Sequence, residues 1–348
     1  MTLTAVSYFH FPYLSENRQI KLFLFVLILA ATNLKSKFAM GSLFCEQRLE
    51  ENMKLLTHHW IFMITFCVLN LMFSVLTCLA NLIVISALRK ASSVPSNLKI
   101  LFLSLAVADF AVGMCPQLMF GVIVAVMLHK NANGDQPFDL CSTSFILLYF
   151  FLFLLASASF LTILAIAVDR YLAVSLHLRY QELVTTNRIV LALISLWVTS
   201  VVTAALFVSL PNNNHLVVVI VEAVGFPVTT IAYIRIYMAV RYHQNRINSQ
   251  MREGGHRLKV SIREQRAAIN SLFFYVIFLA CYTPHLCGTI LLLTDSTSIS
   301  YLVANHATLL LVILNSALNP LVYCWRYRQI RVYAINTIRK LLISRDSE

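Results

Sequence analysis

Seven long apolar runs, separated by short polar segments, constrain this chain more than any other feature. A hydrocarbon core about 30 Å thick requires roughly 20 apolar residues per spanning helix, and the runs are long and continuous rather than the ten-residue alternations of a membrane β-barrel. The predicted spans cover residues 60–88, 98–128, 142–174, 187–210, 215–241, 266–293 and 301–325. The sequence therefore predicts an all-α membrane protein, a seven-transmembrane helix bundle.

Composition supports this prediction. Charged residues make up 12% of the 348 and hydrophobic residues 59%, whereas soluble domains carry about 25% charged residues. The net charge of +12 does not indicate a nucleic-acid partner, because lysines and arginines gather in alternate loops. They follow spans one, three, five and seven, while Lys130 is the basic residue after span two. The positive-inside rule then places the N-terminus outside the cell and the C-terminus inside, as in a multi-pass plasma-membrane protein.

Three regions follow from these spans: an extracellular tail (1–59), a seven-span domain (60–325) and a cytoplasmic tail (326–348). Residues 22–32 are apolar but too short to span, which fits a signal-peptide core; a start codon at Met40 or Met53 is an equal alternative. Basic and apolar residues alternate with helical spacing over 327–342, which predicts an amphipathic helix on the inner lipid surface. The polar loop 242–261 is expected to be flexible.

Polar side chains at membrane depth are functional candidates by default, because burying them there is costly. Asp109 in span two is the clearest example, and Asn81 in span one is a second. Further polar residues at similar depth are Ser159, Asn315, Ser316 and Asn319. Together they predict an oxygen-lined pocket suited to a hard cation and ordered water. The alternative is that they only join helices by hydrogen bonds.

Charged residues also mark the cytosolic ends of two spans. Asp169, Arg170 and Tyr171 end span three, and Glu264 lies at the foot of span six. Arg170 can pair with Asp169 or with Glu264, and a pair between two helices would act as a latch. The alternative is that these charges simply reach toward water at the membrane edge.

Prolines inside the apolar runs predict bends, either hinges or static kinks. They are Pro116, Pro227, Pro284 and Pro320.

These motifs resemble, in order and spacing, the rhodopsin-like G-protein-coupled receptors over about residues 60–340, and most of all the amine, adenosine and melanocortin cluster. The residues that carry the resemblance are Asn81, the LxxAD motif ending in Asp109, Asp169-Arg170-Tyr171, Trp197, Cys281-Tyr282-Thr283-Pro284 and Asn319-Pro320-Leu321-Val322-Tyr323. The resemblance implies a receptor that transmits the signal of an extracellular ligand to heterotrimeric G proteins, rather than an enzyme. A transporter or a channel-like seven-helix protein is the alternative from another class.

The resemblance also implies roles for individual residues. Asp109, Ser159, Asn315, Ser316 and Asn319 would form an allosteric sodium pocket. The activation switch would comprise Asp169, Arg170, Tyr171, Tyr233, Glu264, Phe278, Tyr282, Pro284, Pro320 and Tyr323. Arg170 and Leu178 would contact the G protein. No cofactor is expected beyond the sodium ion, and retinal is excluded because residues 301–325 contain no lysine for a Schiff base.

Several positions depart from the family pattern. Tyr282 replaces the usual tryptophan, and Pro227 lies six residues before Tyr233 instead of eight. Cys141 stands four residues before the usual span-three cysteine, and the loop between spans four and five has no cysteine. The family disulfide is therefore missing, and a bond between Cys141 and Cys45 is the alternative.

The resemblance implies a mostly apolar ligand pocket. Its lining by family position would be Leu152, Phe153, Ala156, His285, Leu286, Thr289, Leu309 and Ile313. Leu152 stands where amine receptors carry an aspartate, so a small neutral or weakly polar molecule or a peptide is expected as ligand. Glu222 in span five faces this pocket as a cation partner, bonds to His285, or is a protonated carboxyl between helices.

Overall fold

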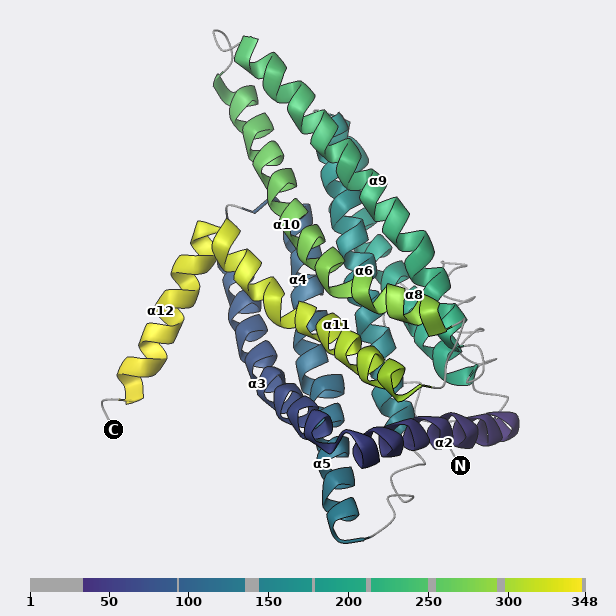
Figure 1. The fold of residues 1–348 in the computed structure, drawn as a ribbon. Helices are drawn as coiled ribbons and strands as arrows, with labels where there is room; N and C mark the ends of the chain where they lie inside the picture. Colours follow the sequence, from purple (N-terminus) through teal and green to yellow (C-terminus); the bar gives the residue numbers. More distant parts are fainter. Residues whose placement is uncertain are drawn as a thin grey trace, which may run out of the picture.

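The computed structural model describes residues 34–92, 94–134, 144–176, 179–210, 214–249, 255–292 and 298–345. Within these ranges every regular element is a helix, and seven helices are long and apolar enough to cross a membrane (Figure 1). They are α3 (Trp60–Lys90), α4 to α5 (Ser96–Ala132), α6 (Ser144–Leu176), α8 (Thr186–Ser209), α9 (Asn214–Ser249), α10 (Gly255–Leu292) and α11 (Ile299–Arg326). The predicted seven-span bundle is confirmed.

Helix α6 is central to the bundle, since it contacts α4, α8, α9 and α10. Buried apolar side chains form two clusters, one in the half of the bundle nearer α12 and one in the half nearer α2. Between them lie five buried polar residues of α4, α6 and α11, which are Asp109, Ser159, Asn315, Ser316 and Asn319. The fold therefore holds its membrane-depth polar residues between two apolar layers.

Span two is irregular at Pro116. Helix α4 (Ser96–Val112) passes into a π-helical turn, η1 (Gly113–Gln117), before α5 (Leu118–Ala132). Proline removes a backbone donor and clashes with the preceding turn, and a π-bulge is one way in which a helix accommodates that. The helices α9, α10 and α11 continue through their prolines.

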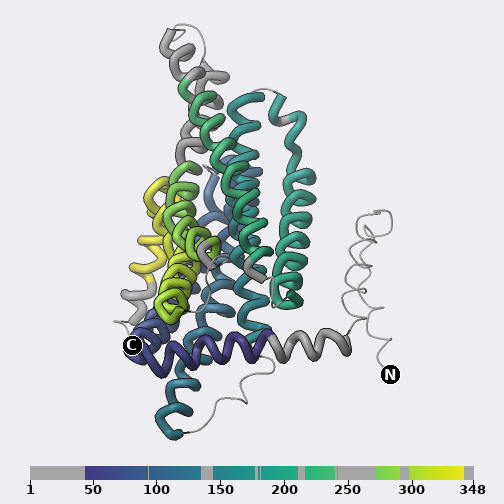
Figure 2. Tube along the Cα trace, turned by 45° about the vertical axis from the view of Figure 1, so that its right-hand side comes forward, coloured from purple at the N-terminus to yellow at the C-terminus, as the bar shows by residue number. Residues whose placement is uncertain are grey.

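A helix outside the predicted spans, α2 (Leu34–His58), occupies much of the N-terminal tail. It lies across the end of the bundle at which α3 begins, roughly perpendicular to the spans (Figures 1 and 2). It contacts α3, α6, α8 and α11. Helix α2 thus covers one end of the bundle.

At the other end, α12 (Arg328–Arg345) follows α11 and packs beside α3, with Lys90 Nζ 4.9 Å from the Tyr333 ring centre. The predicted C-terminal helix is confirmed. The expected flexible loop 242–261 is wrong in extent, because α9 continues to Ser249 and α10 begins at Gly255. Arginine, glutamine and lysine are good helix formers, so polarity alone did not end these helices.

Candidate functional site

Asp109 is the centre of a fully buried polar cluster. Asn319 Nδ2 of α11 donates to Asp109 Oδ2 at 2.7 Å, and Ser159 Oγ of α6 donates to Asp109 Oδ1 at 3.4 Å. Asn81 Nδ2 of α3 donates to the Ser316 carbonyl at 3.1 Å. Four spans therefore meet around one carboxyl group.

Two amide oxygens in this cluster are free to accept a hydrogen bond or to bind a cation. The side-chain oxygens Asn315 Oδ1 and Asn319 Oδ1 are buried and accept no hydrogen bond within the described part of the chain. Buried polar atoms in proteins nearly always have partners, often water or an ion. Carboxylate, hydroxyl and amide oxygens are the ligands that hard cations prefer. The donor set therefore fits the cation pocket predicted from the sequence.

The pair Asp169–Arg170 is sealed inside the end of the bundle nearer α12. Arg170 is 0% exposed and Asp169 2%. The guanidinium donates to Asp169 Oδ2 from Nη2 at 2.6 Å and from Nε at 3.0 Å. Burial argues against the alternative of charges reaching for water, because neither side chain reaches it.

A tyrosine that the sequence analysis did not assign completes this ion pair. Tyr180, in the short helix α7 (Tyr180–Leu183) after span three, donates its hydroxyl to Asp169 Oδ1 at 2.6 Å. Asn97 Nδ2 donates to the Tyr180 oxygen at 3.1 Å and so ties the loop to α4. Burial and the adjacent Asp169 carboxylate raise the pKa of Tyr180, so the phenol keeps the proton that it donates. Arg170 of α6 and Tyr180 of α7 thus hold the Asp169 carboxylate in place.

Of the other residues predicted for the switch and the G-protein contact, some lie in the bundle and some lie where the structure describes no side chain. Tyr171 is half-buried beside the pair. Tyr323 is fully buried and donates its hydroxyl to the Phe102 carbonyl at 3.3 Å. Leu178 lies outside the described residues, and Glu264 lies in a part of α10 whose side chains are not described, so the pairing of Arg170 with Glu264 stays a prediction.

Stacked aromatic rings link α6, α9 and α10 in the middle of the bundle. The Phe278 ring lies 4.3 Å from Tyr282 and 5.1 Å from Phe160. Phe226 of α9 joins them at 5.4 Å from Phe278. The predicted switch residues Phe278 and Tyr282 are therefore in direct contact.

The structure settles the register of α9, which the unusual proline spacing left open. Gly225, and not Pro227, faces this aromatic cluster: a Cβ atom added at Gly225 would lie 2.0 Å from Phe160 Cζ. Eight residues further on, Tyr233 stacks on Tyr275 of α10 at 4.4 Å. Gly225 thus occupies the position eight residues before Tyr233 at which the family pattern has a proline.

Replacing Gly225 by Ala is expected to destabilise the protein by about 1 to 3 kcal/mol, because Phe160 must leave its position. Gly288→Ala in α10 is the matched control, since its new Cβ would meet no atom closer than Thr308 Oγ1 at 3.9 Å. The melting temperatures of the two purified variants give the comparison. Equal melting temperatures would show that the position of Phe160 does not depend on the absence of a side chain at Gly225.

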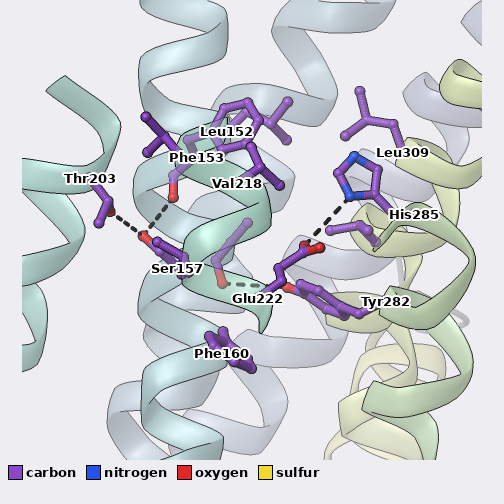
Figure 3. A pocket seen from close by; sticks show the side chains of 14 residues that line it. Leu152, Phe153, Ser157, Phe160, Thr203, Val218, Glu222, Tyr282, His285 and Leu309 are labelled. Atoms are coloured by element: carbon purple, nitrogen blue, oxygen red, sulfur yellow. Dashed lines mark hydrogen bonds and ion pairs between the residues drawn. The ribbon is translucent and has the colours of Figure 1, made fainter. Parts of the chain in front are cut away.

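A small cavity lies between α6, α8, α9, α10 and α11 (Figure 3). Its volume is about 50 Å³, which is room for only a few water molecules, whereas ligand pockets usually measure about 300–1,000 Å³. Its walls are mostly apolar. Polar groups come from Glu222 and His285, with Ser157 and Thr203 on the opposite wall.

Glu222 and His285 point toward one another across the cavity (Figure 3). Glu222 Oε1 lies 3.5 Å from His285 Nδ1, and both residues are buried, with 7% of their surface exposed. Glu222 Oε2 has no hydrogen-bond partner among the described residues. The carboxyl group can therefore receive a donor from a bound molecule.

Most residues predicted for the ligand pocket line this cavity: Leu152, Phe153, Ala156, Glu222, His285 and Leu309. Leu286, Thr289 and Ile313 do not. Thr289 is buried and donates to the His285 carbonyl at 2.9 Å, and Ile313 packs in the apolar cluster nearer α2. Other residues line the cavity although no family position indicated them, which are Ser157, Phe160, Thr203, Val217, Val218, Val221, Tyr282 and Val312. Helical spacing from Phe153 pointed to Ser157 and Phe160, but no pattern marked Thr203.

Cys45 in α2 takes part in a disulfide bond. Cys141, the partner predicted for it, lies outside the described residues, so the pairing itself stays a prediction.

Comparisons with known proteins agree with this geometry. The family described as "7 transmembrane receptor (rhodopsin family)" matches residues 80–217 and 210–323. The chain is 25% identical to melanocortin receptor 3 of Homo sapiens over 280 residues, which is 77% of this chain and 82% of that receptor. It is 24% identical to melanocortin receptor 3 of Rattus norvegicus over 276 residues (77% and 82%) and to melanocortin receptor 4 of Danio rerio over 266 residues (73% and 77%).

Proposed function

The chain belongs to the rhodopsin family of seven-transmembrane receptors and is a G-protein-coupled receptor; from this premise we propose how it receives and transmits its signal. An extracellular ligand binds in the cavity between α6, α9 and α10, at the plasma membrane, with the N-terminus outside. Arg170 is the residue that meets the G protein on the inside. The basic residues of alternate loops support this orientation, and the family argues against a transporter or a channel-like protein.

One observation carries the proposal: the ligand cavity and the core switch share a side chain. Tyr282 lines the cavity and packs on Phe278 at 4.3 Å, and Phe278 in turn stacks on Phe160. A ligand that moves Tyr282 therefore moves α10 relative to α6. Since Arg170 is sealed by α6 and its neighbours, separation of these helices exposes it. The ligand shifts the population by binding the open arrangement more tightly.

The cavity restricts the chemistry of the ligand. A compact apolar group fits its walls, and Glu222 offers a carboxyl oxygen to a cation or a hydrogen-bond donor. Such a group can be a small molecule or one side chain of a peptide. The names of the similar receptors make melanocortins the first ligands to test, followed by peptides, amines, purines and lipids, with cAMP and calcium as readouts.

Glu222→Gln is expected to lower agonist potency about tenfold or more, because a hydrogen bond to a charged group is stronger than one to an amide. The measurement is a concentration–response curve at matched surface expression. Glu182→Gln, an exposed carboxyl of α7, is the control and should leave potency unchanged. Unchanged potency in Glu222→Gln would remove this residue from the ligand site.

We also propose that the Asp109 cluster holds a sodium ion. Asp109, Ser159, Asn315, Ser316 and Asn319 would hold it, and the ion would supply a positive charge that compensates the buried carboxylate. Orphaned oxygens on Asn315 and Asn319 support this proposal. Because the ion would bridge α4, α6 and α11, it would favour the closed bundle.

A further inference from the structure

Helix α2 has one face of mostly apolar residues that is buried and one face of charged residues that is exposed. Its inward residues recur at helical spacing and are nearly all less than 5% exposed: Phe44, Cys45, Arg48, Leu49, Asn52, Leu55 and Leu56. Its outward residues Glu46, Glu50 and Lys54 are exposed, and Lys54 pairs with Glu50 at 2.8 Å. This pattern is that of an amphipathic helix docked on protein. The helix therefore belongs to the folded domain.

Aromatic contacts fix α2 to two spans. The Phe44 ring packs edge-on against Tyr149 of α6 at 5.5 Å and against Phe207 of α8 at 6.0 Å. The guanidinium of Arg48 lies 5.6 Å from the ring centres of both Phe44 and Tyr149. Edge-on ring pairs and cation–π contacts are specific in geometry, so they fix the position of the helix as well as its attachment.

Arg48 also carries an internal ion pair. Its Nη1 atom lies 2.7 Å from Glu51 Oε2. Burial raises the pKa of the Glu51 carboxyl, while the charges of Arg48 and Lys54 oppose that effect. Removing Arg48 would leave a partly buried carboxyl without its main partner. The docked position of α2 therefore depends on Arg48.

The same contacts lead directly to the ligand cavity. Phe207, which Phe44 touches, stacks on Phe153 at 3.5 Å, and Phe153 lines the cavity. Tyr149, which Arg48 covers, lies one helical turn from the cavity residues Leu152 and Phe153. The helix thus contacts residues directly behind the cavity wall, and Phe207 connects it to the wall residue Phe153.

We propose that α2 is a lid over the ligand cavity, held closed by Phe44 and Arg48, and that ligand entry requires its displacement. Three observations carry this inference: α2 crosses the end of the bundle (Figures 1 and 2), its anchor residues touch Tyr149 and Phe207 behind the cavity wall, and the cavity beneath is far smaller than a ligand pocket. The inference rests on the proposed role of this cavity as the ligand site.

The test needs no ligand and no G protein. Ser157→Cys places a thiol in the cavity, and Cys287→Ser removes a native exposed cysteine from the background. Intact cells carrying this receptor are treated with a membrane-impermeant methanethiosulfonate, and labelling is corrected with the parent that retains Ser157. Lys54→Cys, on the exposed face of α2, reports the rate for an open site.

With α2 intact, Cys at position 157 should react at least about tenfold more slowly than Cys at position 54, because a buried group reacts only during local opening. Phe44→Ala or Arg48→Ala should raise the rate at position 157 about tenfold, whereas Glu46→Ala on the exposed face should leave it unchanged. Phe44→Leu, which keeps apolar bulk without the ring, replaces Phe44→Ala if that variant does not reach the surface.

Rapid labelling at position 157 beneath an intact α2 would overturn the lid, and so would the same slow rate in surface-expressed anchor variants. These results are separate from the proposed function. If Glu222→Gln leaves agonist potency unchanged but position 157 is protected by α2, the lid stands without the proposed ligand site. If Glu222→Gln lowers potency but position 157 is labelled rapidly, the ligand site stands without a lid.

Discussion

Replacing Asp169 by Asn is expected to raise ligand-independent G-protein activation by a factor of about 5 to 30, which corresponds to a shift of about 1 to 2 kcal/mol. Asp169 is the charged partner of the fully buried Arg170, and it also accepts the Tyr180 hydroxyl. An amide keeps the shape and the acceptor but loses the charge. Breaking a buried pair by removing one charge is costly, so the closed state loses stability relative to the open one.

The readout is basal signalling at matched surface expression, with Glu182→Gln as the exposed control. A second comparison, Tyr180→Phe, removes one hydrogen bond without changing charge and should give a smaller rise in the same direction. If Asp169→Asn reaches the surface normally and basal signalling stays at the wild-type level, the pair does not restrain the receptor.

Asp109→Asn is expected to abolish stabilisation of the receptor by sodium. An ion present at about ten times its dissociation constant stabilises by about 1.4 kcal/mol, which raises the melting temperature by about 3 to 6 °C for a domain of 150–250 residues. The variant removes the charge that would attract the ion while keeping an oxygen in the same place. Each receptor is purified and melted in sodium chloride and in choline chloride at equal ionic strength.

The quantity to compare is the difference between the two salts, because Asp109→Asn can change stability by itself. Glu222→Gln alters a buried carboxyl outside the polar cluster and should retain the sodium effect. A sodium-dependent rise that survives in Asp109→Asn would place the ion elsewhere, and its absence from wild type would refute the pocket.

Hydropathy was sufficient to predict the seven spans, because each must cover the hydrocarbon core unaided. It did not reveal α2, whose apolar residues occupy one face and alternate with charges. Helix α2 is stable because Phe44 packs on rings of α6 and α8 and Leu55 is fully buried, and such tertiary contacts are not visible in a local sequence window.

The candidate site was predicted unevenly for a similar reason. Asp109, Asn319 and Arg170 stand in motifs, so their positions were known before their contacts. Tyr180 and Gly225 have no such mark, and their roles depend on what the fold brings beside them: the Asp169 carboxylate and the Phe160 ring. The spacing of Pro227 suggested an irregular register in α9, and only the contact with Phe160 identified which residue faces the core.

Nucleotide exchange on heterotrimeric G proteins tests the central claim most directly. Membranes that contain Asp169→Asn are compared with membranes that contain the double variant Asp169→Asn/Arg170→Ala, across one representative of each Gα class. We expect faster exchange by the single variant on at least one class, and a return to the rate of receptor-free membranes in the double variant. Exchange that stays fast without Arg170, or that no Gα class shows, would contradict the claim that Arg170 is the switch through which this receptor acts.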